Sequence, residues 1–284
     1  MYYEKMLNPT YYINGKWLKK SNSKISINDA GFLFGDGLFE TIRFQNKKLF
    51  LINKHFSRLK NGLKIIKIKS HIKDEQLEAI LNKIIKKNEF SNGLIRLMIT
   101  RGELEGKPWN YSGPICIYAS IRPISPISDL PVKVIYFKED NYPIIRYKPA
   151  IKSMNYIGNM LAKKDAEKLN AFEPVFINNN GLITECALRN IFYIKENTLL
   201  TPSEKLGILP GVMRSTIMKI GTKIGLEVVE SNIHKNEIQF MDEAFISSTG
   251  VGLLPCFWKG WTSDFKLTNQ LQKYLFNYIN NTCK

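Results

Sequence analysis

Residues 181–194 read GLITECALRNIFYI and place one acidic residue, Glu185, between two apolar runs. Asn180-Gly181 is a hairpin signal, so PVFINNNGLITE at residues 174–185 predicts two strands joined by a tight turn. A carboxylate among buried strands is costly unless it has a partner. Two interpretations of Glu185 therefore stand: an exposed residue after the hairpin, or an interior carboxylate that pairs with another group.

The first part of the chain alternates strand-like and helical segments, which predicts a small α+β domain over residues 1–122. The segments with strand character are YYINGKW (11–17), LFETIRFQNKKLFLI (38–52, with a hairpin turn at NKK), GLIRLMITRG (93–102) and PICIYASIRPI (114–124). The segments with apolar side chains at helical spacing are HFSRLKNGLKII (55–66) and KDEQLEAILNKIIKKN (73–88).

Residues 123–130 contain prolines and small polar residues and predict a linker to a larger domain over residues 131–284. The strands expected in that domain, besides the hairpin, are VKVIYFKED (132–140), the pair in NIFYIKENTLLTP (190–202) and AFISSTGVGLLPC (244–256), which ends in a small-residue turn. The helices expected there are residues 153–169 and VMRSTIMKIGTKIGLEV (212–228), which stops near Gly225. The predicted fold class is α+β with two domains.

A chain of 284 residues with 44% hydrophobic and 12% aromatic residues can bury a sizeable core, which excludes a disordered protein. No apolar stretch approaches the roughly 18 residues of a membrane span, and residues 1–17 lack the pattern of a secretory signal. The cysteines form no CxxC pair, so we expect reduced thiols in a cytoplasmic protein and no metal site. They are Cys116, Cys186, Cys256 and Cys283.

The net charge of +16 raises the question of nucleic-acid binding. The lysines cluster on the polar side of a helical pattern, as in residues 69–88, and no zinc-finger spacing, RNA-binding aromatic signature or basic tail accompanies them. We therefore predict a solvated basic surface and no nucleic-acid partner. An anionic small-molecule substrate would suit the same charge.

A candidate catalytic residue, Lys152, opens the stretch KSMNYIGNMLAKKDAEKLN at residues 152–170. The later lysines of this stretch fall on the solvated side of the expected helix, whereas Lys152 precedes its apolar run. For Lys152 alone, a surface charge is the ordinary interpretation. A reactive lysine needs a scaffold that holds its amine against a carbonyl and keeps it partly neutral. Glu185 supports that second interpretation, because a carboxylate is a useful partner for the protonated ring nitrogen of a pyridine cofactor.

Two turns could hold a phosphate. GILPGVMRSTIMKIG (207–221) places a glycine before a helix, where the amides of Val212 and Met213 would lie at the positive end of the helix dipole. AFISSTGVG (244–252) offers hydroxyls after a strand, and Arg58 could bind a phosphate through its guanidinium. Each signal alone has an ordinary alternative, such as a Pro-Gly turn. Their order along the chain is more informative.

In that order, the chain resembles the class IV, or fold type IV, pyridoxal-phosphate enzymes. These include branched-chain and D-amino acid aminotransferases and 4-amino-4-deoxychorismate lyase. The resemblance runs from YINGKW to LLPC, and the segments that carry it are FGDGLFETIR (34–43), HFSRL (55–59), KSMNY (152–156), GLITECALRNIF (181–192), TPSEKLGILPGVMR (201–214) and DEAFISSTG (242–250). It implies an enzyme with pyridoxal 5'-phosphate (PLP) as its cofactor, in the interface between a small α+β domain and a larger domain of strands and helices.

The resemblance also implies a role for each matching position. Lys152 would hold the cofactor as a Schiff base and move the Cα proton, and Glu185 would face the ring nitrogen. The other implied cofactor contacts are Arg58, Thr249 and the Val212 and Met213 amides at the phosphate, Tyr156 at the ring hydroxyl, Leu209 against the ring, and Asn190 as a brace for Glu185. The substrate-binding candidates are Phe39, Arg96 and Gly250. Because family members are typically homodimers whose active sites borrow from the neighbouring subunit, a homodimer is expected.

Two reactions of the family stay open. D-amino acid aminotransferases share an Arg-x-His carboxylate trap that TRGELEGKPWNYSG (100–113) lacks, and Phe39 stands where those enzymes have a tyrosine. Branched-chain and D-amino acid aminotransferases tend to carry a glutamate in the turn that STGVGLLPC (248–256) forms here without one. GDGLFETIR, the cysteine after Glu185 and the methionine of GVMR look more like the lyases. These features favour 4-amino-4-deoxychorismate lyase, which releases pyruvate and 4-aminobenzoate in the folate branch, over a transaminase for a branched-chain or other amino acid.

A third alternative is a degenerate member that keeps the fold and serves as a binding protein. The presence of both Lys152 and Glu185 argues against it.

Overall fold

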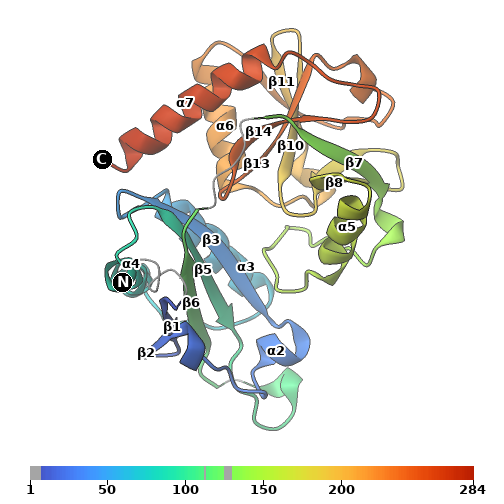
Figure 1. Ribbon diagram of the computed structural model, residues 1–284. Helices are drawn as coiled ribbons and strands as arrows, with labels where there is room; N and C mark the ends of the chain where they lie inside the picture. Colours follow the sequence, from blue (N-terminus) through green and yellow to red (C-terminus); the bar gives the residue numbers. More distant parts are fainter. Residues whose placement is uncertain (1–7, 112, 125–129) are drawn as a thin grey trace. The chain divides into compact units, whose positions relative to one another are not determined.

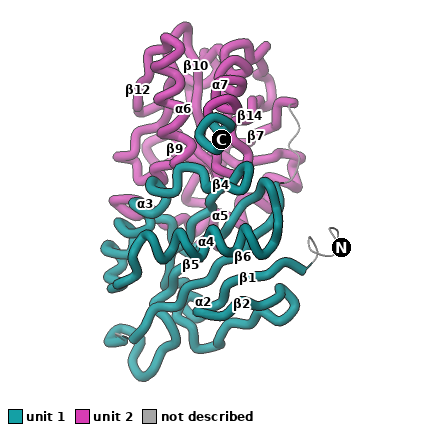
Figure 2. The backbone as a smooth tube through the Cα atoms, turned by 90° about the vertical axis from the view of Figure 1, so that its left-hand side faces the viewer, with its two compact units in different colours: residues 1–125, 151–155, 279–284 teal, residues 126–150, 156–278 magenta. Residues whose placement is uncertain are grey.

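The computed structural model describes residues 8–111, 113–124 and 130–284, and the chain divides into two compact units (Figure 2). Unit 1 comprises residues 1–125, 151–155 and 279–284, and unit 2 comprises residues 126–150 and 156–278. The predicted boundaries are contiguous and differ from these units at residues 151–155 and 279–284. The predicted linker 123–130 and the N-terminal segment without a signal pattern fall partly outside the described residues.

Unit 1 contains a six-stranded antiparallel sheet in the order β2-β1-β6-β5-β3-β4 (Figure 1). Its strands are β1 (Thr10–Ile13), β2 (Lys16–Lys19), β3 (Gly37–Gln45), β4 (Lys48–Leu49), β5 (Gly93–Thr100) and β6 (Cys116–Arg122). Asn46 and Lys47 have positive φ angles of 50° and 62°, which confirms the turn predicted at NKK. The strand character expected over residues 11–17 is confirmed by β1 and β2, and Asn14 and Gly15 turn the chain between them with φ angles of 42° and 92°.

The helices of unit 1 are α2 (Ala30–Phe34), α3 (Ile52–Ile65) and α4 (Asp74–Asn88). Helix α3 contacts β3, and α4 contacts β1 and β6, so both cover the sheet. Helix α4 starts where the Gln76 side chain accepts a hydrogen bond from the Lys73 amide at 2.9 Å. The helices predicted over residues 55–66 and 73–88 are therefore confirmed, because their apolar faces are the faces that pack on the strands.

Residues 152–154 extend the edge of β3 within unit 1. The Phe39 amide donates a hydrogen bond to the Lys152 carbonyl at 3.0 Å, and the Met154 amide donates to the Gly37 carbonyl at 3.0 Å. The segment therefore behaves as an additional short strand, and the backbone of Lys152 is held by the sheet.

Unit 2 contains an eight-stranded mixed sheet in the order β12-β11-β10-β13-β14-β7-β8-β9. Its strands are β7 (Val132–Lys138), β8 (Glu173–Ile177), β9 (Ile183–Cys186), β10 (Asn190–Lys195), β11 (Thr198–Pro202), β12 (Glu227–Ser231), β13 (Glu243–Ser248) and β14 (Gly252–Phe257). The hairpin predicted at Asn180-Gly181 is confirmed, since β8 and β9 pair antiparallel and Gly181 has a φ of 74°. The small-residue turn predicted within residues 244–256 is also present, and it joins β13 to a second strand, β14.

The helices of unit 2 are α5 (Ile157–Lys168), α6 (Val212–Lys223) and most of α7 (Lys266–Thr282). Helix α5 contacts β7 and β8, and α6 contacts β12 and β13. The helix predicted over residues 153–169 is wrong at its start, because residues 152–154 pair with β3 and α5 begins only at Ile157. The prediction of α6 is confirmed, and it ends before Gly225, which has a φ of 90°.

Helix α7 was not predicted, although its sequence carries a signal. Leu271, Leu275, Ile279 and Cys283 recur at intervals of four residues and are all buried. Its last residues belong to unit 1, where Asn280 accepts a hydrogen bond from Gln45.

Among the described residues, no helix has the length and apolar composition needed to cross a bilayer.

Candidate active site

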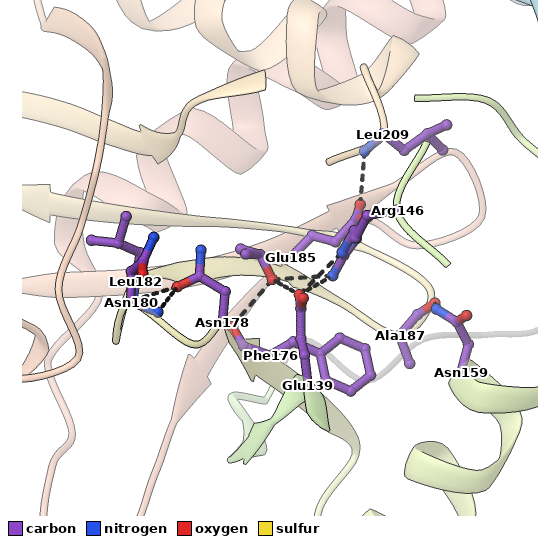
Figure 3. Close-up of polar contacts among 11 residues, drawn as sticks. Glu139, Arg146, Asn159, Phe176, Asn178, Asn180, Leu182, Glu185, Ala187 and Leu209 are labelled. Carbon is purple, nitrogen blue, oxygen red and sulfur yellow. Dashed lines mark hydrogen bonds and ion pairs between the residues drawn. The ribbon is translucent and has the colours of Figure 1, made fainter. Parts of the chain in front are cut away.

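Glu185 lies on β9 in unit 2 and both of its carboxylate oxygens are engaged (Figure 3). One oxygen, Oε1, accepts a hydrogen bond from Arg146, and the other, Oε2, accepts one from the Leu209 amide at 3.1 Å. The Glu185 side chain is 14% exposed. Glu185 is therefore the interior carboxylate of the two sequence interpretations, and Arg146 and the Leu209 amide are its partners within unit 2.

Arg146 and Glu139 are site residues that sequence reasoning missed. The guanidinium of Arg146 donates to Glu139 from Nε at 3.0 Å and to the Thr184 hydroxyl at 3.1 Å, and Thr184 donates to Glu139 at 2.6 Å. The signal available in the sequence was a lone arginine shortly before Lys152 in NYPIIRYKPAIK. Its spacing from Glu185 gives no reason to pair the two, so only the fold brings them together.

The turn before α6 is braced by two polar side chains. Glu185 accepts from the Leu209 amide, and Asn190 donates from its side-chain nitrogen to the Leu209 carbonyl at 3.0 Å. A Cβ atom on Gly211 would lie 2.1 Å from the Asn190 Oδ1, so a larger residue there would displace the Asn190 side chain from the turn. The structure thus brings together Glu185, Asn190 and Leu209, because Glu185 and Asn190 hold the amide and the carbonyl of the same residue.

The N-terminus of α6 has the properties of an anion site. Gly211 occupies the N-cap position and no side chain caps the helix. The side chains of Val212 and Met213 are buried, so these residues offer their backbone amides. Asn190 is the first residue of β10 and pairs with Ser247 near the end of the antiparallel β13, so the turn containing Thr249 follows at the same end of these two strands. Because Asn190 also contacts Leu209, both expected phosphate turns lie at that end of β10 and β13.

Lys152 lies in unit 1 beside an aromatic ring. Its ammonium is 4.6 Å from the centroid of the Phe39 ring, and the guanidinium carbon of Arg96 is 3.8 Å from the same centroid. Phe39 is buried, whereas Arg96 is exposed on β5. The structure therefore groups the catalytic candidate with two of the three substrate-binding candidates, and it presents two cations around one ring.

Arg58, the expected phosphate ligand of unit 1, forms a buried ion pair. It donates to both oxygens of Glu40, at 2.8 Å from Nε and 2.6 Å from Nη2, and His55 Nδ1 lies 2.7 Å from the same carboxylate. Burial alone would raise the pKa of Glu40, but Arg58 and His55 outweigh it and lower the pKa to about 2. Burial lowers the pKa of His55, although the hydrogen bond to Glu40 and the charge of Glu40 oppose this.

Replacing Glu40 by glutamine is expected to lower the free energy of unfolding by about 3 kcal/mol at neutral pH. The reason is that a folded pKa of about 2, against 4.5 for a free glutamate, stabilises the folded state fully above pH 4.5 and progressively less as the pH falls toward 2. Chemical denaturation at several pH values measures this free energy. The difference in the free energy of unfolding between the wild type and Glu40→Gln should decrease as the pH falls from 4.5 to 2. The control is Glu75→Gln, an exposed position on α4. A difference that stays constant with pH would contradict the assignment.

Tyr156 and Gly250 are the remaining predicted site residues. Tyr156 is half-buried at the N-cap of α5, and Gly250 lies in the turn between β13 and β14 beside Thr249. Their contacts with a cofactor or substrate stay predictions.

The residues present fit a phosphorylated pyridine cofactor. Unit 2 offers a helix N-terminus that begins at a glycine and that no side chain caps, and a half-buried carboxylate whose Oε2 accepts a hydrogen bond from the Leu209 amide in the preceding turn. The first feature suits a phosphate and the second a protonated ring nitrogen. Among the described residues, no group of three or more His, Cys, Asp or Glu could hold a metal ion.

Comparison with known proteins gives the family. The sequence profile described as "Amino-transferase class IV" matches residues 37–256, which is most of the chain. A relative from Methanocaldococcus jannaschii, which carries the provisional name of a branched-chain-amino-acid aminotransferase, is 30% identical over 250 residues, covering 87% of this chain and 86% of the relative. A D-alanine aminotransferase of Listeria monocytogenes is 30% identical over 253 residues, with 86% and 85% covered. An aminodeoxychorismate lyase of Bacillus subtilis is 29% identical over 251 residues, with 86% and 84% covered.

Solved structures show the same fold. The branched-chain aminotransferase of Thermoproteus uzoniensis superposes with a TM-score of 0.89 at 20% sequence identity, over 97% of this chain and 96% of that one. The chain therefore belongs to the class IV aminotransferase family and has its two-part α+β fold. It is a PLP-dependent enzyme, since this family uses that cofactor. The predictions of family, fold class, cofactor and enzymatic nature are confirmed.

Proposed function

We propose that the chain is a 4-amino-4-deoxychorismate lyase, with amino transfer as the alternative reaction. The observation that carries this choice is the turn between β13 and β14, where Thr249, Gly250 and Val251 contribute no acidic group. Aminodeoxychorismate bears two carboxylates, and an acidic side chain in a turn that faces the bound ligand would repel them. The exposed guanidinium of Arg96 beside Phe39 is a suitable receptor for one of these carboxylates.

The same proposal assigns roles to the residues of both units. Lys152 would attach the cofactor, Glu185 would face its ring nitrogen, and Tyr156 would contact its ring hydroxyl. The proposed phosphate ligands are Arg58, Thr249 and the amides of Val212 and Met213. Leu209 would pack on the ring. When bound, PLP withdraws electrons from the carbon that carries the substrate's amino group and so makes the proton on that carbon removable.

Lys152 then acts as a general base and acid. Its neutral amine accepts the proton from the amino-bearing ring carbon, and the adjacent carbon–oxygen bond breaks to release the enolpyruvyl group. The leaving oxygen ends as the keto oxygen of pyruvate after proton uptake, and the ring that remains is aromatic 4-aminobenzoate. The Phe39 amide of β3 donates a hydrogen bond to the Lys152 carbonyl and so fixes the Lys152 backbone. The amine can therefore move only by rotation of its own side chain.

The experiment that tests the reaction is incubation of the holoenzyme with aminodeoxychorismate and no 2-oxo acid. We expect pyruvate and 4-aminobenzoate in equal amounts. A parallel reaction contains leucine and 2-oxoglutarate and is assayed for glutamate. Absence of pyruvate in the first reaction, with glutamate in the second, would establish the transaminase instead.

The transaminase alternative rests on the relatives. Those named above include enzymes called aminotransferases as well as one called a lyase, at nearly equal identity. The exposed Arg96, which contacts the same Phe39 ring as Lys152, would also receive the carboxylate of an amino acid. The two reactions share every step up to removal of the proton, so the product assay is the measurement that separates them.

A further inference from the structure

Arg146 is shared between two carboxylates in unit 2. It donates from Nη1 to Glu185, and from Nε and Nη2 to one oxygen of Glu139 (Figure 3). Glu139 sits on the 3-10 turn Glu139–Asn141 that follows β7, and Thr184 also donates to its Oε1 at 2.6 Å. The side chains of Arg146, Glu139 and Glu185 are each 14–15% exposed, so water screens them only in part.

The charges of this cluster do not cancel. Two carboxylates surround one guanidinium, which leaves one negative charge. Burial alone would lower the pKa of Arg146, but the charges of Glu185 and Glu139 outweigh it and raise that pKa, so the arginine stays protonated. A simple Arg146–Glu185 pair would instead be neutral, and its carboxylate would be a poorer partner for a second cation.

Two other carboxylates on the neighbouring elements have partners of their own. Glu173 on β8 pairs with Arg189, and Asp165 on α5 pairs with Lys168. Tyr142, which follows the Glu139 turn, donates to Asp165 at 3.2 Å. Lys148, two residues after Arg146, lies beside Gly207 and stays unchanged in every variant used below.

We propose that Glu139 is a positioning residue that draws the charge of Arg146 away from Glu185 and so keeps Glu185 available to a protonated cofactor ring. The inference rests on the proposed role of Glu185. It adds a function for Glu139, which accepts hydrogen bonds from Arg146 and acts through it. Thr184 fixes the carboxylate of Glu139 in this arrangement.

The test is Glu139→Gln, which keeps the shape and an acceptor oxygen but removes the negative charge. The readout is a pH titration of the 15N chemical shift of the ring nitrogen in bound PLP, which reports the protonation of that nitrogen directly. Removing a negative charge near a protonated group lowers its pKa, so we expect the midpoint to move to lower pH by about one unit. We also expect turnover to fall about tenfold, while the unfolding temperature of the apoprotein changes little.

The matched control is Asp140→Asn, which removes the same charge one residue away at an exposed position. It should leave the titration midpoint where it is. The double variant Glu139→Gln/Arg146→Gln restores one net negative charge to the cluster, so its midpoint should return toward that of the wild type. If Glu139 had a purely structural role, the double variant would have a lower turnover and a lower unfolding temperature than Glu139→Gln, and its midpoint would not return.

The outcomes separate this inference from the function on which it rests. If Glu185→Gln shifts the midpoint and Glu139→Gln does not, the role of Glu139 is refuted and that of Glu185 stands. If neither variant shifts it, the assignment of Glu185 to the ring nitrogen fails, and the role of Glu139 fails with it.

Discussion

Replacing Lys152 by alanine is expected to abolish turnover, with a loss of at least about a thousandfold. The variant lacks both the amine that would attach PLP and the base that would take the proton. Its backbone interactions remain, because the Lys152 carbonyl accepts from Phe39 and the neighbouring Met154 amide donates to Gly37 without using the side chain. We therefore expect a folded protein that has lost the absorbance near the visible edge shown by the wild type.

The control for this variant is Lys164→Ala, which removes an exposed lysine of α5. It should keep both the absorbance and the turnover. Added primary amines supply a second measurement, since partial rescue of Lys152→Ala by an external base would identify proton transfer as part of what was lost. A Lys152→Ala protein with unchanged absorbance and turnover would contradict the assignment of Lys152.

Replacing Glu185 by glutamine is expected to lower turnover about a hundredfold or more, with a smaller change, within about tenfold, in PLP affinity. Glutamine removes the charge that would favour a protonated ring nitrogen but preserves an oxygen that can accept from the Leu209 amide. The phosphate ligands expected on α6 and the β13–β14 turn are unaffected, which is why binding should persist. Steady-state kinetics and titration of the apoprotein with PLP give the two quantities.

Two variants control this experiment. Glu167→Gln removes an exposed carboxylate of α5 and should match the wild type in both measurements. Arg146→Gln releases Glu185 from its ion pair but retains the carboxylate, so it should lose less turnover than Glu185→Gln. Turnover of Glu185→Gln close to that of the wild type would show that another group faces the ring nitrogen.

Much of this architecture could be predicted from local sequence. The hairpin at Asn180-Gly181 and the helix after Gly211 follow from backbone preferences that act over a few residues. Glu185 was recognisable because an acidic residue interrupted apolar strands, and that interruption is visible without any distant contact. The family and the cofactor followed from the order of several such segments.

The missed features depend on contacts between distant segments. Ser153 and Met154 precede a helical apolar pattern and were predicted as part of that helix. They pair with β3 instead, because tertiary hydrogen bonds outweigh a weak helix propensity at a helix start. Arg146 and Glu139 look like ordinary surface charges in sequence, and only the return of β9 past them makes a cluster. The role of Arg96 beside Phe39 likewise required the register of β3 and β5.

The pairing of residues 152–154 with β3 also bears on how the chain is made. During synthesis, β3 emerges early, but the segment that completes its edge at Gly37 and Phe39 follows only after the start of unit 2. An unpaired strand edge is a template for association with other chains. The nascent polypeptide therefore carries an unpaired edge of β3 until residues 152–154 have been synthesised. Lys152, the residue proposed for catalysis, belongs to the segment that pairs with this edge.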